Sequence, residues 1–337
     1  MVDSLQMRDR LLRIVDQFSN RRLAVAGDLI ADQFLYGQTS RVSREAPVLV
    51  LQYRDLIRVP GGAANAANNL LDLGCHVMVI GAVGPDAAGT DLISALKEKG
   101  ADIRNITQVE LYSTPVKTRI LAGAHHSSPQ QIVRVDRESR LPVEWCPPWN
   151  RLRRSFRTLD GIIISDYGYG AAEPSVLQEL KRLRKDSSTP LVVDSRFRMA
   201  AFQGVTSMTP NITELEASEV VSINGDQQLL RRVARRVLRK QRLGSLLVTQ
   251  GRFGMMLFQP RRAPVHIPIY GTDEVADVTG AGDTVIAVFT LSLACGGSPE
   301  DSARLANYAG GIVVMKRGTA TVNREELFSA VRQDLSS

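Results

Sequence analysis

Short apolar or β-branched runs alternate with stretches of helical periodicity along almost the whole chain of 337 residues. The runs that predict strands are 23–26, 77–80, 161–165, 191–194 and 245–249. The stretches that predict helices are 63–73, 90–99, 174–185 and 227–242. Alternation of this kind gives right-handed crossovers, and hence a mostly parallel central sheet with helices on both faces. We therefore expect one α/β domain over residues 1–337.

Two stretches, 33–59 and about 110–136, consist of strand-like patterns with no helix between them. Alternating strands without covering helices predict a small antiparallel β lid that is set apart from the main sheet. Such a sheet could be a flap over an active site, an edge used for dimerisation, or both.

Composition and segment lengths limit where the protein works. With 44% apolar and 23% charged residues, the chain can bury a large core without metals or disulfides. The isolated cysteines Cys75, Cys146 and Cys295 form no C-x-x-C pair, which suits a reducing compartment. The charged N-terminus predicts an amphipathic helix rather than a signal peptide, and the apolar stretch 285–295 is too short to span a bilayer. We expect a cytoplasmic protein with no membrane partner.

Basic residues are in excess, with 42 Lys and Arg against 35 Asp and Glu, a net charge of +7. Such an excess fits nucleic acid, a membrane surface or an anionic substrate. Much of it lies in residues 231–242, where apolar residues recur at helical spacing, as in a solvated surface helix. Aromatic residues make up only 5% of the chain and are not interleaved with the basic ones, so we expect no nucleic-acid partner.

The strongest chemical motif is Asp277-Val-Thr-Gly-Ala-Gly-Asp-Thr284, which is followed by an apolar helix. Glycines at 280 and 282 let the backbone turn and approach a ligand, and amides at a helix N-terminus attract an anion. Asp283 would repel a phosphate there, unless it takes a proton from an attacking hydroxyl. We predict an anion hole at Gly280, Ala281 and Gly282, with Asp283 as catalytic base. The alternative is an aspartate helix cap after a glycine turn.

A second motif, Pro60-Gly-Gly-Ala-Ala-Asn65, starts a helix with small residues. It allows close approach to a ligand, and the Asn65 amide could recognise sugar hydroxyls. The alternative is tight packing of the helix on the sheet. Motifs of P-loop enzymes, Rossmann dehydrogenases and protein kinases are absent from the sequence.

Together with Thr209-Pro-Asn211, Glu214, Thr249-Gln-Gly251 and Gly254, these motifs resemble the ribokinase-like (PfkB) sugar kinases over about residues 23–322. The resemblance implies a ribokinase-like fold, an ATP-dependent carbohydrate kinase and Mg²⁺ bound by Glu214, directly or through water. It also implies a monovalent cation near Asp277. The nucleotide-site positions that it implies are Asn211, Glu214, Thr249, Gly251, Gly254 and Asn307. The sugar-site positions that it implies are Asp32, Gly61, Gly62 and Asn65.

Within that family, residues 27–32, 40–48 and Ser165-Asp166-Tyr167 resemble the heptose 7-phosphate kinases of lipopolysaccharide precursor synthesis. The resemblance implies transfer of the γ-phosphoryl group to O1 of D-glycero-D-manno-heptose 7-phosphate, with Asp166 in the substrate site. Many such kinases carry a fused nucleotidyltransferase domain. This chain ends soon after Val322, so we expect the single-activity form. We also expect a homodimer formed through the lid.

The sequence departs from that subgroup at Tyr169, where a lysine is usual, and at Ser195-Arg196, where Pro-Lys is usual. The candidates for binding an anionic substituent of the sugar are Lys117, Arg119, Arg134 and Arg196. Each could instead be a surface charge. Two other functions stay open: a ribokinase-like kinase for another sugar or sugar phosphate, and a sugar- or nucleic-acid-binding relative without catalysis.

Overall fold

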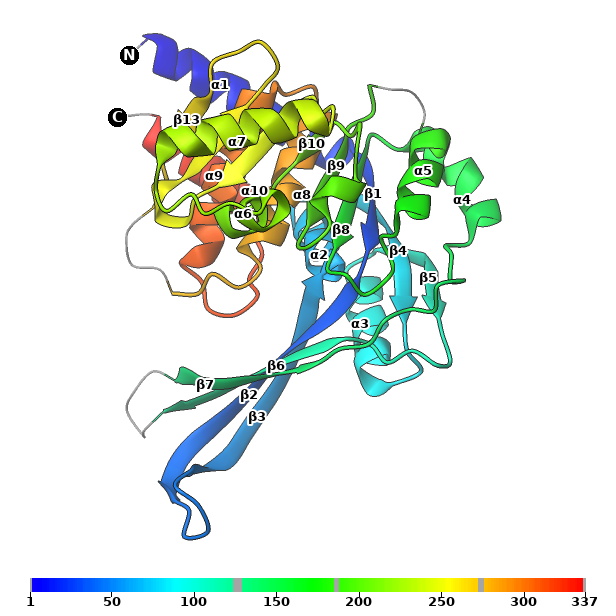
Figure 1. Ribbon diagram of the computed structural model, residues 1–337, viewed down its shortest axis with the longest axis vertical. Helices are drawn as coiled ribbons and strands as arrows, with labels where there is room; N and C mark the ends of the chain where they lie inside the picture. Colours follow the sequence, from blue (N-terminus) through cyan, green and yellow to red (C-terminus); the bar gives the residue numbers. More distant parts are fainter. Residues whose placement is uncertain (1, 124–128, 185–187, 272–275, 336–337) are drawn as a thin grey trace.

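The computed structural model describes residues 2–123, 129–184, 188–271 and 276–335. These residues form a large sheet with the strand order β13-β12-β11-β10-β9-β8-β1-β4-β5 (Figure 1). All its pairings from β5 to β11 are parallel, and β12 and β13 are antiparallel to their neighbours, which confirms the mostly parallel sheet. The strands are β1 (Arg22–Gly27), β4 (His76–Val83), β5 (Asp102–Gln108), β8 (Gly161–Asp166), β9 (Leu191–Ser195), β10 (Ser207–Met208), β11 (Ser245–Thr249), β12 (Met255–Phe258) and β13 (Val265–Ile267).

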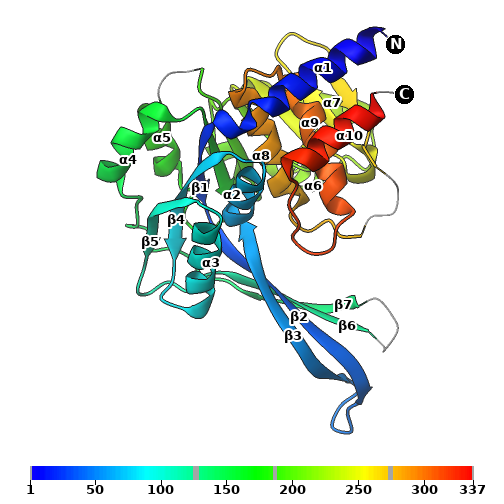
Figure 2. The same cartoon turned by 180° about the vertical axis from the view of Figure 1, so that it is seen from behind.

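Helices cover both faces of this sheet, as predicted (Figures 1 and 2). One core, which includes Leu70 and Phe289, lies under α1 (Val2–Asp16), α2 (Ala63–Asp72), α3 (Ala87–Glu98), α8 (Ala281–Ala294), α9 (Pro299–Val314) and α10 (Arg324–Asp334). The other, which includes Phe156 and Leu230, lies under α4 (Trp149–Ser155), α5 (Pro174–Leu183), α6 (Ile212–Glu219) and α7 (Gln227–Lys240). Short 3₁₀ turns lie at Phe18–Asn20, Phe156–Thr158, Met199–Ala201 and Gly251–Phe253.

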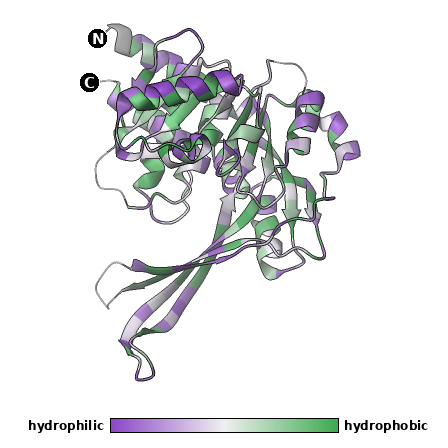
Figure 3. Cartoon of the chain, viewed as in Figure 1, coloured by the Kyte–Doolittle hydropathy of each residue, from purple (hydrophilic) through white to green (hydrophobic). Residues whose placement is uncertain are grey.

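The basic segment forms the surface helix that its pattern predicts. Helix α7 buries Leu230, Val233, Val237 and Leu238, and its arginines are exposed, so that hydrophilic and hydrophobic residues alternate along it in Figure 3. The apolar stretch 285–295 belongs to α8 and the residue that follows it, and most of it is buried in the core. Within the described ranges, no helix has both the length and the apolar character needed to cross a bilayer.

The predicted lid is a separate sheet with the order β3-β2-β6-β7, which projects from the main body in Figure 1. Its strands are β2 (Leu29–Val42), β3 (Leu49–Gly62), β6 (Val116–Gly123) and β7 (Gln130–Arg137). The hairpin β2–β3 and the pair β6–β7 are antiparallel, whereas β2 and β6 run parallel. The first pair starts earlier than the predicted residue 33, because β2 follows β1 almost directly. The second starts at 116 rather than 110, because residues 110–115 form a turn and a connection.

The carboxyl ends of the parallel strands gather the polar residues that matter for chemistry. Asp28 follows β1, Tyr167 follows β8, Asp194 lies at the end of β9 and Thr249 ends β11. Ligands of open α/β sheets bind at this edge. The strands approach so closely there that a Cβ on Gly27 would lie 2.1 Å from the Ser165 carbonyl oxygen.

Candidate active site

The centre of the site is the carboxylate of Asp283 in the first turn of α8, which is only 4% exposed. Asn65 Nδ2 donates to its Oδ2 over 3.0 Å, and the Tyr167 hydroxyl donates to its Oδ1 over 2.9 Å. Burial raises the pKa of Asp283 to about 7, although both hydrogen bonds favour the ionised form. A carboxyl group with this pKa can accept or release a proton near neutral pH.

The Asn65 amide is oriented by a chain of buried hydrogen bonds. Asn69 Nδ2 donates to the Asn65 side-chain oxygen over 3.2 Å, and the Thr284 hydroxyl donates to the Asn69 side-chain oxygen over 2.9 Å. The Asn65 side-chain nitrogen therefore faces Asp283. The tight packing expected of the motif at 60–65 is present, since the alanines beside Asn65 are fully buried. The recognition of sugar hydroxyls by the Asn65 amide stays a prediction, because that amide contacts Asp283 and Asn69 in the structure.

Two glycines at the start of α8 have different surroundings. Gly280 caps the helix with φ 79°, and a Cβ on it would lie 2.5 Å from Asn65 Nδ2. A Cβ on Gly282 would meet nothing within 4 Å. The Ala281 N–H donates to the Val278 carbonyl over 3.3 Å, so Gly282 is the part of the predicted anion hole with the most open backbone.

Asp32 faces the same region from β2, but both of its oxygens already accept hydrogen bonds. Arg119 Nη1 donates to Oδ1 over 2.7 Å, and the Thr319 hydroxyl donates to Oδ2 over 3.0 Å. Gly61 is needed beside it, because a Cβ there would lie 2.6 Å from Asp32 Oδ2. A Cβ on Gly62 would lie 2.8 Å from the Asp28 carbonyl oxygen.

The four predicted cations have different partners. Arg119 is paired with Asp32, and Arg134, opposite Arg119 in the lid register, is paired with Asp136. Lys117 Nζ lies 4.4 Å from the centre of the Tyr167 ring, and Arg196 stacks near Phe197. Among the described residues, neither Lys117 nor Arg196 has an ion-pair partner, so these two cations remain for an anionic ligand. Burial lowers the pKa of Lys117, and the nearby carboxylates Asp32 and Asp283 oppose that shift.

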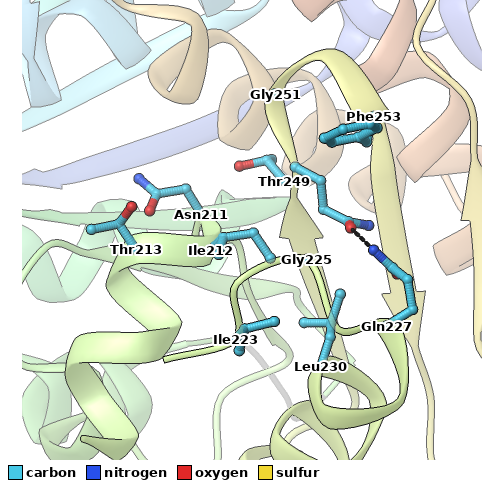
Figure 4. A pocket seen from close by; sticks show the side chains of 11 residues that line it. Asn211, Ile212, Thr213, Ile223, Gly225, Gln227, Leu230, Thr249, Gly251 and Phe253 are labelled. Atoms are coloured by element: carbon cyan, nitrogen blue, oxygen red, sulfur yellow. Dashed lines mark hydrogen bonds between the residues drawn. The ribbon is translucent and has the colours of Figure 1, made fainter. Parts of the chain in front are cut away.

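A cleft of about 580 Å³ extends from Asp283 past Asp194, Arg196 and Glu214 to Thr249. It shares Asn211, Thr213 and Thr249 with a neighbouring hollow of about 420 Å³ (Figure 4). That hollow is largely apolar and has room for a flat ring. Its walls are Asn211, Ile212, Thr213, Ile223, Gly225, Gln227, Leu230, Thr249, Gln250, Gly251 and Phe253.

Asn211 and Glu214 form the capping box of α6. The Asn211 side chain accepts from the Glu214 N–H, and Glu214 Oε2 accepts from the Asn211 N–H, both over 2.9 Å. Burial raises the pKa of Glu214, and burial together with the Glu214 charge holds the pKa of Asp194 well above its usual range. The two carboxylates therefore suit Mg²⁺, a hard cation that prefers oxygen ligands and would relieve their repulsion. No group of three or more metal-binding side chains occurs in the described ranges.

Residues 20–326 match the model of the pfkB family carbohydrate kinases. This chain belongs to that family. The bifunctional protein HldE of Geobacter sulfurreducens is 42% identical over 91% of the kinase chain, and that of Sodalis glossinidius is 37% identical over 94%. The kinase chain spans about 62% of the length of the Geobacter protein and 64% of the Sodalis protein.

Solved structures agree on the ribokinase-like fold. Arabidopsis thaliana ribokinase complexed with ribose and ATP superposes with a TM-score of 0.72 at 18% identity, covering 93% of the kinase chain and 98% of ribokinase. Escherichia coli phosphofructokinase-2 with substrates and products gives 0.71 at 18% identity, covering 94% and 100%. The prediction of a carbohydrate kinase is confirmed, and the family implies ATP and usually Mg²⁺.

Three predicted ligand positions of the kinase make close contacts within the chain. A Cβ on Gly254 would lie 2.1 Å from the Ile267 carbonyl oxygen, and Asn307 Nδ2 donates to the Pro268 carbonyl over 2.9 Å. Neither residue lines the two hollows described above. Asp166 borders the cleft, but its carboxylate accepts from Arg198 and from the Ser195 hydroxyl. Gly254 and Asn307 therefore lie outside the two hollows, whereas Asp166 borders the cleft, and the ligand roles of all three stay predictions.

Asp277 closes a loop in the kinase, since its side chain accepts the N–H groups of Thr279 and Gly318 over 2.9 and 3.1 Å. The monovalent cation near it stays a prediction. Our prediction of site residues from the sequence missed Asp28, Tyr167, Asp194 and Arg198. Asp28, Tyr167 and Asp194 lie at or just after the end of a buried strand, where parallel strands present ligand-facing residues, and that position was the available signal.

The two glycines of α8 provide a matched pair of substitutions. Gly280→Ala should lower both thermal stability and turnover, because its Cβ collides with the Asn65 amide at a backbone angle that alanine adopts poorly. Gly282→Ala should change the melting temperature by no more than about 2 °C, as a substitution at an open surface position does, because its Cβ meets no other atom. It should still reduce ATP turnover, because its methyl group projects into the cleft. Calorimetry and a coupled ADP assay measure both. Equal loss of stability in the two variants would contradict this assignment.

Proposed function

We propose that this kinase transfers the γ-phosphoryl group of ATP to O1 of D-glycero-D-manno-heptose 7-phosphate, in the cytoplasmic synthesis of the lipopolysaccharide precursor ADP-heptose. The resemblance of residues 27–32 and 40–48 to heptose 7-phosphate kinases supports it. The bifunctional HldE relatives also support it. The observation that carries the proposal is a buried carboxylate, Asp283, with the open Gly282 turn beside it and with Lys117, a cation that has no ion-pair partner among the described residues, nearby.

Asp283 acts as the base of the reaction. It takes the proton of the sugar hydroxyl, whose oxygen then attacks the γ-phosphorus as the bond to ADP breaks. The amides at the start of α8 stabilise the charge on the transferred group, since they point from a helix N-terminus. Glu214 and Asp194 would hold Mg²⁺, directly or through water, and that ion would supply positive charge to the polyphosphate.

Lys117 and Arg196 select a sugar that already carries phosphate. A phosphomonoester brings close to two negative charges at neutral pH and needs cationic partners. Arg119 and Arg134 contribute less, because Asp32 and Asp136 already neutralise them. Lys117 therefore carries most of this selection on the lid side of the site.

A kinase for another sugar phosphate is the second candidate, and Tyr169 favours it. Its hydroxyl donates to Glu138 over 2.9 Å at a position where the heptose kinases usually carry a lysine. A tyrosine–glutamate pair in place of a cation changes the charge near the substrate. A panel of sugar phosphates separates the two candidates.

Asp283→Asn should keep the fold and the binding of ATP while turnover falls by about 10²–10⁴-fold, because an amide accepts no proton from the sugar. Asp301→Asn is a control on α9, since this carboxylate pairs with Arg10 and lines neither hollow. Near-normal turnover in a folded Asp283→Asn variant would remove Asp283 from the role of base.

Lys117→Met should raise the sugar KM by about ten- to a hundredfold and leave the ATP KM nearly unchanged, since it removes one charge-assisted contact to the sugar phosphate. Lys99→Met, which removes a surface ion pair with Asp72, is the control. A sugar without the phosphate should be a poor substrate. If unphosphorylated sugars react as well as their phosphates, the heptose 7-phosphate proposal is wrong.

The proposal also includes a homodimer in which the lids of two chains pack against each other. Its strands expose large apolar side chains that one chain leaves uncovered: Val42, Leu49, Tyr53, Ile57, Ile132, Val133 and Val135. Val135→Glu should convert a dimer at micromolar concentration into a monomer in analytical ultracentrifugation, because a charge would be buried between the sheets. Leu111→Glu, at a position 94% exposed outside the lid strands, should not. A wild-type monomer at that concentration would contradict the dimer.

A further inference from the structure

Asp28 is a fully buried carboxylate for which the proposed reaction has no direct use. Its oxygens accept the backbone N–H groups of Tyr167, Tyr169 and Ala171 over 2.8, 3.1 and 2.9 Å. Burial raises the pKa of Asp28 to about 6, and these three hydrogen bonds oppose the shift. One side chain thus fixes the whole turn that follows β8.

The backbone of Asp28 ties that turn to α2. Its N–H donates to the Ser165 carbonyl over 3.1 Å, and its carbonyl accepts the Ala63 N–H over 3.0 Å. Helix α2 carries Asn65, and the turn after β8 carries Tyr167. The two donors that hold Asp283 are therefore both anchored at Asp28, one through its backbone and one through its side chain.

Tyr167 reaches Asp283 from a half-buried position. Its hydroxyl donates to Asp283 Oδ1 over 2.9 Å, while Lys117 Nζ lies over the face of its ring. Burial and the Asp283 charge hold the pKa of Tyr167 well above its usual value. The hydroxyl therefore stays a donor throughout the working pH range.

We propose that Tyr167 is a positioning residue that fixes the orientation of the Asp283 carboxylate and sets the pH at which it accepts a proton, and that the Asp28 side chain keeps Tyr167 in place. This inference rests on the proposed role of Asp283 as base. The Asn65 amide holds the other carboxylate oxygen, so loss of the tyrosine hydroxyl leaves Oδ1 without its donor.

Several titratable groups face Asp283 from the surrounding elements. They are Asp32 from β2, Lys117 from β6 and Asp194 from β9, with Tyr167 from the turn after β8. Asp32 and Asp194 disfavour the ionised form of Asp283, and Lys117 favours it. With the tyrosine hydroxyl removed, the balance moves toward the protonated form. The base then becomes active only at higher pH.

Tyr167→Phe tests this directly, because it removes one hydroxyl and keeps the ring under Lys117. In the plot of kcat against pH, the acidic limb should move to higher pH by about one unit, which is the effect of losing one hydrogen bond to a charged group. The KM values for sugar and ATP should change by less than about threefold, because the variant alters a hydrogen bond to Asp283 and not the binding of either substrate in the ground state. Tyr169→Phe, which removes a hydroxyl bonded to Glu138, should leave the acidic limb in place. An unmoved limb in Tyr167→Phe overturns the proposal.

Asp28→Asn tests the second half of the proposal, since it keeps the size of the side chain but replaces an acceptor by an N–H₂ group. The limb should move in the same direction as in Tyr167→Phe. The double variant should show no larger shift than Tyr167→Phe alone, because Asp28 acts through Tyr167. Additive shifts would contradict this order of action. If Asp28→Asn does not fold, Tyr167→Phe with Tyr169→Phe still decides the role of the tyrosine.

The failure of this inference is distinct from failure of the proposed function. If Asp283→Asn retains turnover, the base itself is wrongly assigned and the limb belongs to another group. If Asp283→Asn is inactive while Tyr167→Phe keeps the wild-type limb, the base stands and only the positioning role of Tyr167 is wrong.

Discussion

One buried carboxylate organises this molecule. Asp283 sits in the first turn of α8, where the helix N-terminus favours negative charge and burial disfavours it. Both of its oxygens are held by donors, and Asn65 is 218 positions away along the chain. The left-handed turn at Gly280, the asparagine chain on α2 and the turn after β8 are all required to bring those donors there. Burial leaves the carboxyl group with a pKa of about 7, which suits a base near neutral pH.

Other parts of the fold add an apolar surface and positive charge to the site. The carboxyl edge of the sheet places an apolar hollow next to the cleft, and the lid strands carry cations to the same region. Charge is distributed unevenly in this arrangement, since Asp32 and Asp136 neutralise two of the lid cations while Lys117 has no carboxylate partner in the described structure. A polar ligand that enters the site therefore meets the carboxylates of Asp194 and Glu214 in the cleft and the cation Lys117 on the lid side.

The sequence allowed accurate prediction of features that depend on local pattern. The strand–helix alternation, the lid and the helix after residue 280 follow from periodicity and glycine spacing, and the structure has all three. Pairings that depend on register could not be predicted. Arg119 meets Asp32 only because β2 and β6 run side by side, and nothing near either residue indicates that contact.

Some motif positions also have packing contacts that the sequence does not indicate. Gly254 and Asn307 match the family order. A Cβ on Gly254 would collide with the Ile267 carbonyl oxygen, and Asn307 donates to the Pro268 carbonyl. Tyr167 and Asp28 were the opposite case, because their importance comes from hydrogen bonds across β1, β8 and α8. These two residues are identified by their neighbours in the folded structure rather than by their residue types.

The central claim, a buried Asp283 that exchanges its proton near neutral pH, can be measured without turnover. In a protein with ¹³C-labelled aspartate carboxyl groups, the resonance that is missing from Asp283→Asn is assigned to this residue. The account predicts that it titrates with a midpoint near 7 in the ligand-free protein. A midpoint close to 4, the value of an ordinary exposed aspartate, would contradict it.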